Sequence, residues 1–142
     1  MSDLSTRRSL PIALLRARES VMQDIRPLLN NIGLTEQKWR VLRSLDESGV
    51  VEQTAIARDA CLLLPSLTRI LQSLEEDGLV RRSRDLEDKR RTLVSITEDG
   101  QQLVHDNLGM ADKLNADLEK KLGRKKLGQL LDLLEALQDP KG

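Results

Sequence analysis

The sequence is almost free of aromatic side chains. Among its 142 residues there is no Phe and no Tyr, and Trp39 is the single aromatic residue. Proteins that bind RNA or single-stranded DNA commonly stack bases on aromatic side chains, so this composition argues against both classes. If the chain binds nucleic acid, double-stranded DNA is the better candidate.

Cysteine and long apolar runs are also scarce. Cys61 is the only cysteine, so no intramolecular disulfide can form, which excludes a disulfide-stapled secreted domain and favours a reducing compartment. No segment approaches the ~20 apolar residues of a membrane helix, and residues 1–8 lack the apolar core of a signal peptide. We therefore expect a cytoplasmic protein without a membrane partner.

Net charge is absent as well, because 23 Lys and Arg residues balance 23 Asp and Glu residues. A neutral chain can attract nucleic acid only if its charges are unevenly placed. The proportions of charged residues (32%) and hydrophobic residues (39%) are typical of a folded, helix-rich protein. A length of 142 residues is enough for one domain, residues 1–142.

Motifs for catalysis and metal binding are missing too. The sequence has no glycine-rich phosphate loop, no G-x-S-x-G and no H-E-x-x-H, so an enzyme is not expected. His105 is the single histidine, and neither a metal site nor a cofactor is predicted. For Cys61 two interpretations stay open: an exposed, peroxide-sensing thiol, or a buried packing residue, which its neighbours Ala60 and Leu62 favour.

What is present is mainly helical periodicity. Apolar residues at three- and four-residue spacing predict an amphipathic helix over 10–32, kinked at Pro27, and a second over 36–47 that follows the N-cap Thr35. Short helices are predicted around 53–60 and over 65–77, the latter opened by Pro65. Two more are predicted over 97–122 and 125–137.

Between these helices, two β-prone runs, 79–82 and 93–96, predict a hairpin with a charged tip. Two short helices followed by a hairpin is the order of a winged helix-turn-helix, in which the second short helix enters the major groove of DNA. The predicted fold is mainly α, with a winged helix-turn-helix lobe over 35–97 and long dimerisation helices over 8–32 and 98–140. The leucine stripes of these terminal helices are broader than one small lobe can cover, which predicts a homodimer.

Residue types that reach phosphates and base edges gather in the predicted lobe. The predicted hairpin carries an excess of three positive charges between Arg81 and Thr92. Cations that neutralise phosphates release counterions, and an arginine at a narrow tip can enter the minor groove. Alone, such a segment is as readily a solvated loop, but directly after a helix-turn-helix it favours DNA binding. The predicted DNA contacts are Pro65, Ser66, Thr68, Arg69, Gln72, Arg84, Asp88, Lys89, Arg90 and Arg91.

The sequence resembles a known family. DKRR at 88–91 followed by LVSITEDG at 93–100 resembles the D-x-R…LT-x-x-G signature of the MarR family, the multiple-antibiotic-resistance type regulators of bacteria and archaea. PSLTR at 65–69 and LEEDGLV at 74–80 are similar to that family's recognition helix, although Leu64 stands where a polar N-cap is usual. Residues 13–19 and 34–40 also resemble the subgroup that regulates homoprotocatechuate (4-hydroxyphenylacetate) degradation. The resemblance spans essentially the whole chain.

The resemblance implies a cytoplasmic, nucleoid-associated repressor that binds pseudo-palindromic operator DNA as a homodimer and is released by a small aromatic or phenolic acid. It also implies that Asp88 orients Arg90 toward the minor groove. The alternative is a winged-helix protein-interaction adaptor without a ligand response.

The same resemblance suggests Arg16, Trp39 and Arg43 as ligand-binding residues. An arginine offers a planar fork for a carboxylate, and an indole offers a face for an aromatic ring. Ordinary structural roles stay open for all three, because Trp39 is suited to a hydrophobic staple with Leu34 and the arginines to surface ion pairs.

Overall fold

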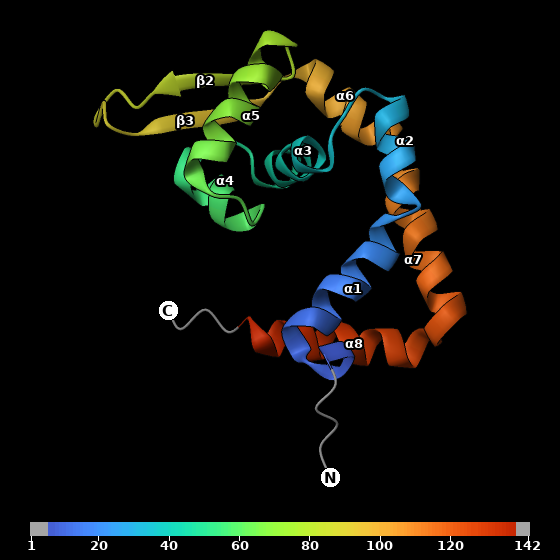
Figure 1. The fold of residues 1–142 in the computed structure, drawn as a ribbon. Helices are drawn as coiled ribbons and strands as arrows, with labels where there is room; N and C mark the ends of the chain where they lie inside the picture. Colours follow the sequence, from blue (N-terminus) through green and yellow to red (C-terminus); the bar gives the residue numbers. More distant parts are fainter. Residues whose placement is uncertain (1–5, 139–142) are drawn as a thin grey trace. The chain divides into compact units, whose positions relative to one another are not determined.

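The structure, a computed structural model, describes residues 6–138 (Figure 1). The chain divides into two compact units, Met1–Asn107 and Leu108–Gly142. The predicted DNA-binding lobe 35–97 lies inside the first unit, as do the described residues of the predicted helical segment 8–32. The boundary between the units falls within the predicted segment 98–140, of which residues 139 and 140 lie outside the described residues.

The elements follow the predicted order, with a mainly helical chain and one antiparallel hairpin. The first unit contains η1 (Thr6–Arg8), α1 (Leu10–Met22), α2 (Ile25–Asn31), α3 (Glu36–Ser48), β1 (Val51–Glu52), α4 (Gln53–Asp59), α5 (Leu64–Glu76), β2 (Val80–Arg84), β3 (Thr92–Ile96) and α6 (Glu98–Asp106). The second unit contains α7 (Gly109–Leu122) and α8 (Arg124–Leu137), which contact each other.

Two predicted long helices are interrupted. The segment 10–32 breaks at Gln23 and Asp24, between α1 and α2, and not at Pro27. A proline ring clashes with the carbonyl four residues earlier, here that of Gln23, so the helix ends one turn before the proline. The segment 97–122 breaks after α6, where the side chain of Asn107 donates to the carbonyl of Leu103 at 2.8 Å, a local bond of the kind that competes with helix continuation.

A short third strand was missed by the sequence patterns. β1 pairs antiparallel with β3, so the strand order is β1-β3-β2 and β3 lies in the middle. Val51 lies opposite Val94, and Val80 opposite Ile96. Two residues are too few to show the alternation by which a strand is recognised in sequence, so β1 is defined only by its partner.

The core of the first unit forms around α3. This helix contacts α2, α4, α5, α6 and β3, and Figure 1 shows it surrounded by them. Thr35 caps its start by accepting a hydrogen bond from the backbone N–H of Lys38 at 3.2 Å, as predicted. Burying a leucine stabilises a fold by about 1.5–3 kcal/mol, so the shared core holds α5 and the hairpin on one body. Its fully buried residues include Val41, Leu42, Leu45, Ile56, Leu67, Leu71, Leu74, Val94 and Val104.

Thr97 and Gly100 join the hairpin to α6. The Thr97 hydroxyl accepts from the backbone N–H of Gly100 at 3.1 Å and donates to the carbonyl of Gly78 at 2.7 Å. A Cβ on Gly100 would lie 2.3 Å from the carbonyl oxygen of Leu79, so glycine is required by close approach of the backbone. The T-x-x-G part of the signature is therefore explained by packing.

Cys61 occupies a turn position that glycine usually fills. At the end of α4 its N–H donates to the carbonyl of Arg58 at 3.3 Å, and the N–H of Leu62 donates to that of Ala57 at 2.8 Å. This is the Schellman pattern, which needs a left-handed residue, and Cys61 has φ 57°. The turn leaves the thiol exposed, so the interpretation of Cys61 as a buried packing residue is wrong. Leu62 is the residue that packs against the core.

We expect the Cys61→Gly variant to be at least as stable as the wild type and the Cys61→Val variant to be clearly less stable. A left-handed conformation costs a residue with a Cβ roughly 1–2 kcal/mol, partly offset by the larger unfolded-state entropy of glycine. A β-branched residue there should lower the free energy of unfolding by a further ~1 kcal/mol. Urea denaturation measures both changes, and equal stability of the two variants would contradict the turn.

Candidate nucleic-acid interface

The candidate interface is built on α5, whose two sides differ in character. Leu67, Leu71 and Leu74 are fully buried and fasten the helix to the core. The opposite side exposes Pro65, Thr68, Arg69 and Gln72, while Ser66 is half-buried. The helix thus presents four of its five predicted contact residues exposed on the side away from the core.

The hydroxyl of Thr68 is held in place from two directions. The side-chain amide of Gln53, the first residue of α4, donates to Thr68 Oγ1 at 2.7 Å. Thr68 Oγ1 in turn donates to the carbonyl of Leu64 at 3.0 Å. Gln53 was not predicted as part of the interface, because its contribution depends on how α4 crosses α5 and no local pattern signals that crossing.

The hairpin is clamped to α5 through Arg82 and Glu75. Nε and Nη2 of Arg82 donate to Glu75 Oε1 at 3.1 and 2.8 Å, and the backbone N–H of Arg82 donates to Oε2 at 3.1 Å. The hydrogen bonds from Arg82 lower the pKa of Glu75 below its usual range, so this carboxyl group is ionised at neutral pH. The clamp fixes the base of the hairpin relative to α5, and it pairs the charge of Arg82 with that of Glu75.

At the tip of the hairpin, the carboxylate of Asp88 holds the exposed side chain of Arg90. Asp88 Oδ1 accepts from the backbone N–H and from Nε of Arg90, both at 3.1 Å, and Oδ2 accepts from Nη2 at 3.3 Å. These bonds lower the pKa of Asp88 below its usual range, while the Arg90 side chain stays 91% exposed. The guanidinium is therefore oriented and still open to a partner.

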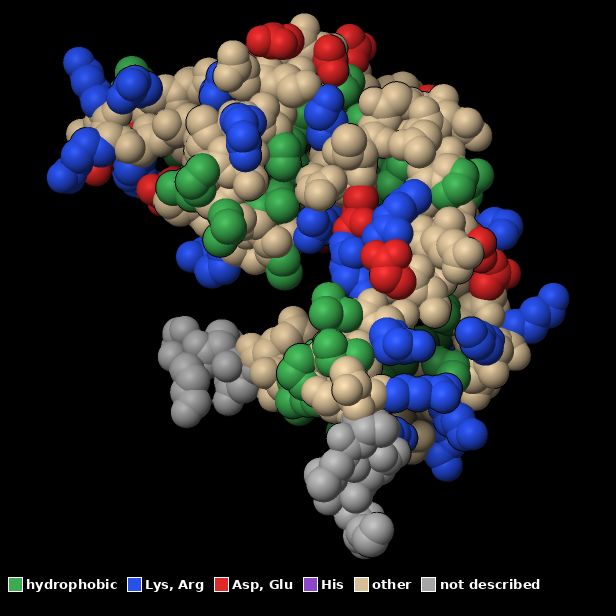
Figure 2. Space-filling view, viewed as in Figure 1, with side chains coloured by type: hydrophobic (Ala, Val, Ile, Leu, Met, Phe, Trp, Pro, Cys, Tyr) green, Lys and Arg blue, Asp and Glu red, His purple; other side chains and the backbone are tan. Residues whose placement is uncertain are grey.

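The other predicted cations of the hairpin differ in how far they are paired within the protein. Nη1 of Arg84 donates to the carbonyl of Lys89 at 2.7 Å and so braces the turn. Arg91 lies 3.4 Å from Glu52 of β1 and 3.1 Å from Asp85, so two carboxylates neutralise it. Lys89 is exposed, and Figure 2 shows Lys and Arg side chains gathered at the end of the hairpin.

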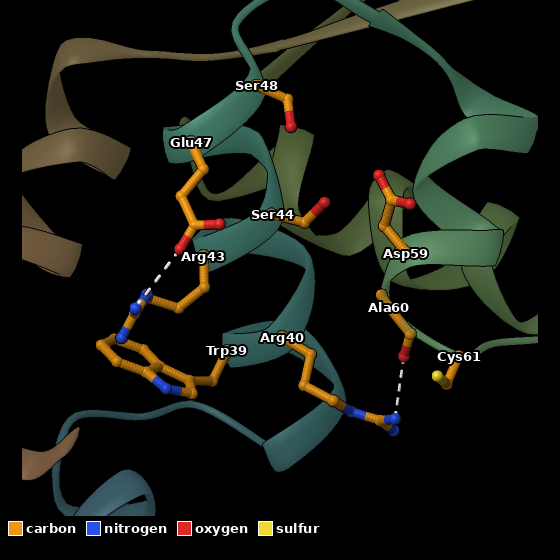
Figure 3. A pocket seen from close by; sticks show the side chains of 9 residues that line it. All are labelled: Trp39, Arg40, Arg43, Ser44, Glu47, Ser48, Asp59, Ala60 and Cys61. Atoms are coloured by element: carbon orange, nitrogen blue, oxygen red, sulfur yellow. Dashed lines mark hydrogen bonds and ion pairs between the residues drawn. The ribbon is translucent and has the colours of Figure 1, made fainter. Parts of the chain in front are cut away.

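A pocket of about 370 Å³ lies beside α3 in the same unit (Figure 3). The guanidinium carbon of Arg43 is 6.0 Å from the Trp39 ring centroid, within cation–π range, and Arg43 Nη2 donates to Glu47 Oε1 at 3.4 Å. Nη1 of Arg40 reaches across to the carbonyl of Ala60 at 2.8 Å. The lining residues are Trp39, Arg40, Arg43, Ser44, Glu47, Ser48, Asp59, Ala60 and Cys61.

The pocket brings together two of the three predicted ligand-binding residues. Trp39 and Arg43 line it, whereas Arg16 is an exposed residue of α1 and is not among its lining residues. Arg40 was not predicted as a lining residue, although it directly follows Trp39 in the sequence. The volume falls at the lower end of the range of small-molecule sites, and the lining carries one indole, the guanidinium groups of Arg40 and Arg43, and the carboxylates of Glu47 and Asp59.

His105 is exposed, and its Nε2 lies 3.2 Å from Asp46 Oδ2. Within residues 6–138 there is no group of three or more His, Cys, Asp or Glu side chains that could hold a metal ion. In the same described part of the chain, no helix has both the length and the apolar character needed to cross a membrane.

The sequence of the lobe matches characterised regulators. Residues 34–92 match the MarR family. The chain is 43% identical over 68 residues to the HTH-type transcriptional regulator FarR of Neisseria gonorrhoeae, a match that covers 48% of this chain and 47% of FarR. It is 50% identical over 60 residues to the homoprotocatechuate degradative operon repressor of Escherichia coli, covering 42% of this chain and 40% of that protein. These matches span less than half the length of both relatives.

Solved structures match over nearly the whole chain. A transcriptional regulator is 45% identical with a TM-score of 0.89, covering 96% of this chain and 100% of that one. NadR in complex with 4-hydroxyphenylacetate is 38% identical with a TM-score of 0.84, covering 99% of each chain. The transcriptional repressor CouR, bound to a 23-mer DNA duplex, is 28% identical with a TM-score of 0.83, covering 96% of this chain and 99% of CouR.

Fold, sequence and site geometry together show that this chain belongs to the MarR family. The predicted family and the predicted winged helix-turn-helix fold are confirmed, as is the expected class of transcriptional regulator. The homoprotocatechuate operon repressor and the 4-hydroxyphenylacetate complex of NadR, both among its relatives, support the narrower resemblance.

Proposed function

We propose that this chain is a cytoplasmic repressor that binds pseudo-palindromic operator DNA as a homodimer and is released by a small aromatic or phenolic acid. The observation that carries DNA binding is the hydrogen-bonded pairing of α5 with the hairpin. The Arg82–Glu75 clamp sets the distance between a polar helix face and an exposed, oriented Arg90. That pairing suits simultaneous contact with a major groove and the adjacent minor groove, and the proposal includes no enzymatic activity.

The homodimer is supported by uncovered leucines at both ends of the chain. α1 exposes Leu10, Leu14 and Leu15, and α8 exposes Leu130, Leu131, Leu133 and Leu137. Apolar patches of this kind in a soluble protein mark interaction surfaces, and a second copy would remove them from water. A two-fold dimer would present two α5 helices to half-sites about one helical turn apart, which is why we propose a symmetric operator.

We expect the wild-type protein to sediment as a dimer, and the Leu15→Glu and Leu131→Glu variants to dissociate or lose folded structure. Each variant places a charge in a surface that the dimer would bury, and an unpaired buried charge is strongly unfavourable. Leu86→Glu is the matched control, because Leu86 is 95% exposed at the hairpin tip. A wild-type protein that sediments as a folded monomer at micromolar concentration would contradict the homodimer.

DNA binding is tested by comparing Arg90→Ala with Arg69→Ala on an operator selected from a randomised duplex pool and on a scrambled duplex. Arg90→Ala should weaken binding to both duplexes and reduce the salt slope by about one phosphate contact. Arg69→Ala should mainly lower the preference for operator, since a good base contact contributes about 1–3 kcal/mol of discrimination. Titrations at several salt concentrations measure both effects, and Lys126→Ala on α8 controls for loss of one charge.

The outcome also separates the repressor from the alternative function. A protein-interaction adaptor would show no salt-dependent preference for any duplex, and Arg90→Ala would then leave both affinities and the slope unchanged. Such a result would reject the repressor and favour the adaptor.

Release by an aromatic acid is supported by the pocket of Trp39 and Arg43. A bound carboxylate could replace Glu47 as the partner of Arg43 while its ring meets the indole. The pocket also includes Ala60 and Cys61, which lie in the turn that leads into α5, so occupancy can change the placement of the DNA-contacting helix. Any such coupling is reciprocal: an acid that weakens DNA binding must itself bind more weakly to the DNA complex.

Calorimetry with hydroxyphenylacetates, hydroxybenzoates and hydroxycinnamates should detect binding of at least one acid to the wild-type protein. Arg43→Ala should weaken acid binding by roughly tenfold or more, because a charge-assisted hydrogen bond contributes about 1.5–3 kcal/mol, and should affect DNA affinity little. Arg16→Ala is the comparison variant. Undetectable heat with every acid would reject the effector, and an equal loss in both arginine variants would move its site away from this pocket.

A further inference from the structure

The start of α5 is apolar, whereas the rest of its exposed side is polar. Leu63, the residue before the helix, is 77% exposed, and Leu64, its first residue, is 43% exposed. Pro65 follows and is exposed as well. We call these three consecutive exposed apolar residues the helix-start patch.

The helix-start patch lies on the side of α5 that carries the candidate DNA contacts. Residues four apart share a helix face, so Leu64 precedes Thr68 by one turn and Gln72 by two. The hydrogen bond from Thr68 Oγ1 to the carbonyl of Leu64, at 3.0 Å, shows the first of these alignments directly. In a recognition helix the N-terminal residues contact base edges. Leu64 therefore lies on the same side of α5 as these candidate contacts, at the N-terminal end of the proposed interface.

Packing inside the lobe does not account for these leucines. Leu62 before them already packs against the core, and Leu67 after them is fully buried. The N-cap of α5 is Leu63 and not Leu64, where the family resemblance placed it. A polar residue at position 63 could cap the helix, as Thr35 and Thr97 cap α3 and α6, but α5 has no side-chain cap hydrogen bond. The chain therefore forgoes a capping hydrogen bond and exposes two leucines at this point.

We propose that the helix-start patch reads the C5-methyl group of thymine in the major groove, with Leu64 as the main contact. Of the four standard bases only thymine presents an apolar group there, and cytosine would place an amino group against the patch without a hydrogen-bond partner. The exposed guanidinium group of Arg58, on α4, matches the charge of a flanking phosphate. This inference rests on the proposed DNA binding and adds the base that the patch selects.

The test uses the full chain and a duplex enriched by it from a randomised pool. Each thymine of that duplex is replaced in turn by deoxyuridine, which differs only by lacking the C5-methyl group. At one or two positions in each half-site we expect about fourfold weaker binding, the factor that corresponds to about 0.8 kcal/mol for one buried CH₂-sized group. The salt slope should not change, because no phosphate contact is lost.

Variants of the patch residues test whether the patch causes the loss of affinity on deoxyuridine replacement. Leu64→Ala should bind the thymine and deoxyuridine duplexes equally, and Leu63→Ala should reduce the difference between them. Val50→Ala, which truncates a 67% exposed side chain in the turn before β1, should keep the wild-type difference. Thermal melts followed by circular dichroism verify that each variant is folded.

Two outcomes would overturn the inference. One is an enriched duplex in which no deoxyuridine changes the affinity, or for which Leu64→Ala retains the wild-type sensitivity. The other is a patch that serves as a contact between copies, in which case Leu63→Ala and Leu64→Ala would change the sedimentation coefficient and leave the deoxyuridine effect unaltered. If the protein enriches no duplex at all, the proposed DNA binding fails with it, an outcome distinct from binding that is blind to the methyl group.

Discussion

The packing of apolar side chains around α3 is the interaction on which the rest of the first unit depends. α3 contacts helices on several sides and the central strand β3, so elements far apart in the sequence share one core. Interiors of this kind are close-packed and transmit strain. The polar side of α5, the hairpin and the pocket of Trp39 are consequently built on one shared core, and the ion pairs need only refine an arrangement that hydrophobic burial has already produced.

The arginines of the hairpin do not contribute equally to its surface charge. Arg82 is held by Glu75, and Arg91 by Glu52 and Asp85, whereas Arg90 is steadied by Asp88 yet almost fully exposed. An ionised pair at the surface contributes little stability, so its main effect here is on position. A neutral chain thereby presents a local positive surface at the hairpin tip, because some cations are matched inside the protein and others extend from it.

Much of the fold could be predicted from local signals, and the departures have physical causes. Thr35, Pro65 and Gly78 mark helix ends by their own chemistry, so α3 and α5 were placed within a residue or so. Pro27 predicts a break in the first long helix, but its ring clashes with a carbonyl one turn earlier, so the break lies before the proline. β1 and Gln53 depend on partners distant in sequence. Cys61 was misjudged because apolar neighbours suggested burial, whereas its left-handed backbone turns the thiol outward. Arg16 and Arg43 look alike in sequence, and only the fold shows which of them lines the pocket.

The two hydrogen bonds of Thr68 have a consequence for what this side chain can offer to DNA. Its single proton is committed to the carbonyl of Leu64, and one of its two lone pairs receives the amide of Gln53. What remains is an acceptor without a donor. Phosphate oxygens accept hydrogen bonds and cannot donate them, so the hydroxyl as held is matched to an amino group, which in the major groove belongs to adenine or cytosine. If α5 enters the major groove as proposed, Gln53 would make the Thr68 hydroxyl an acceptor that favours a base edge over the phosphate backbone.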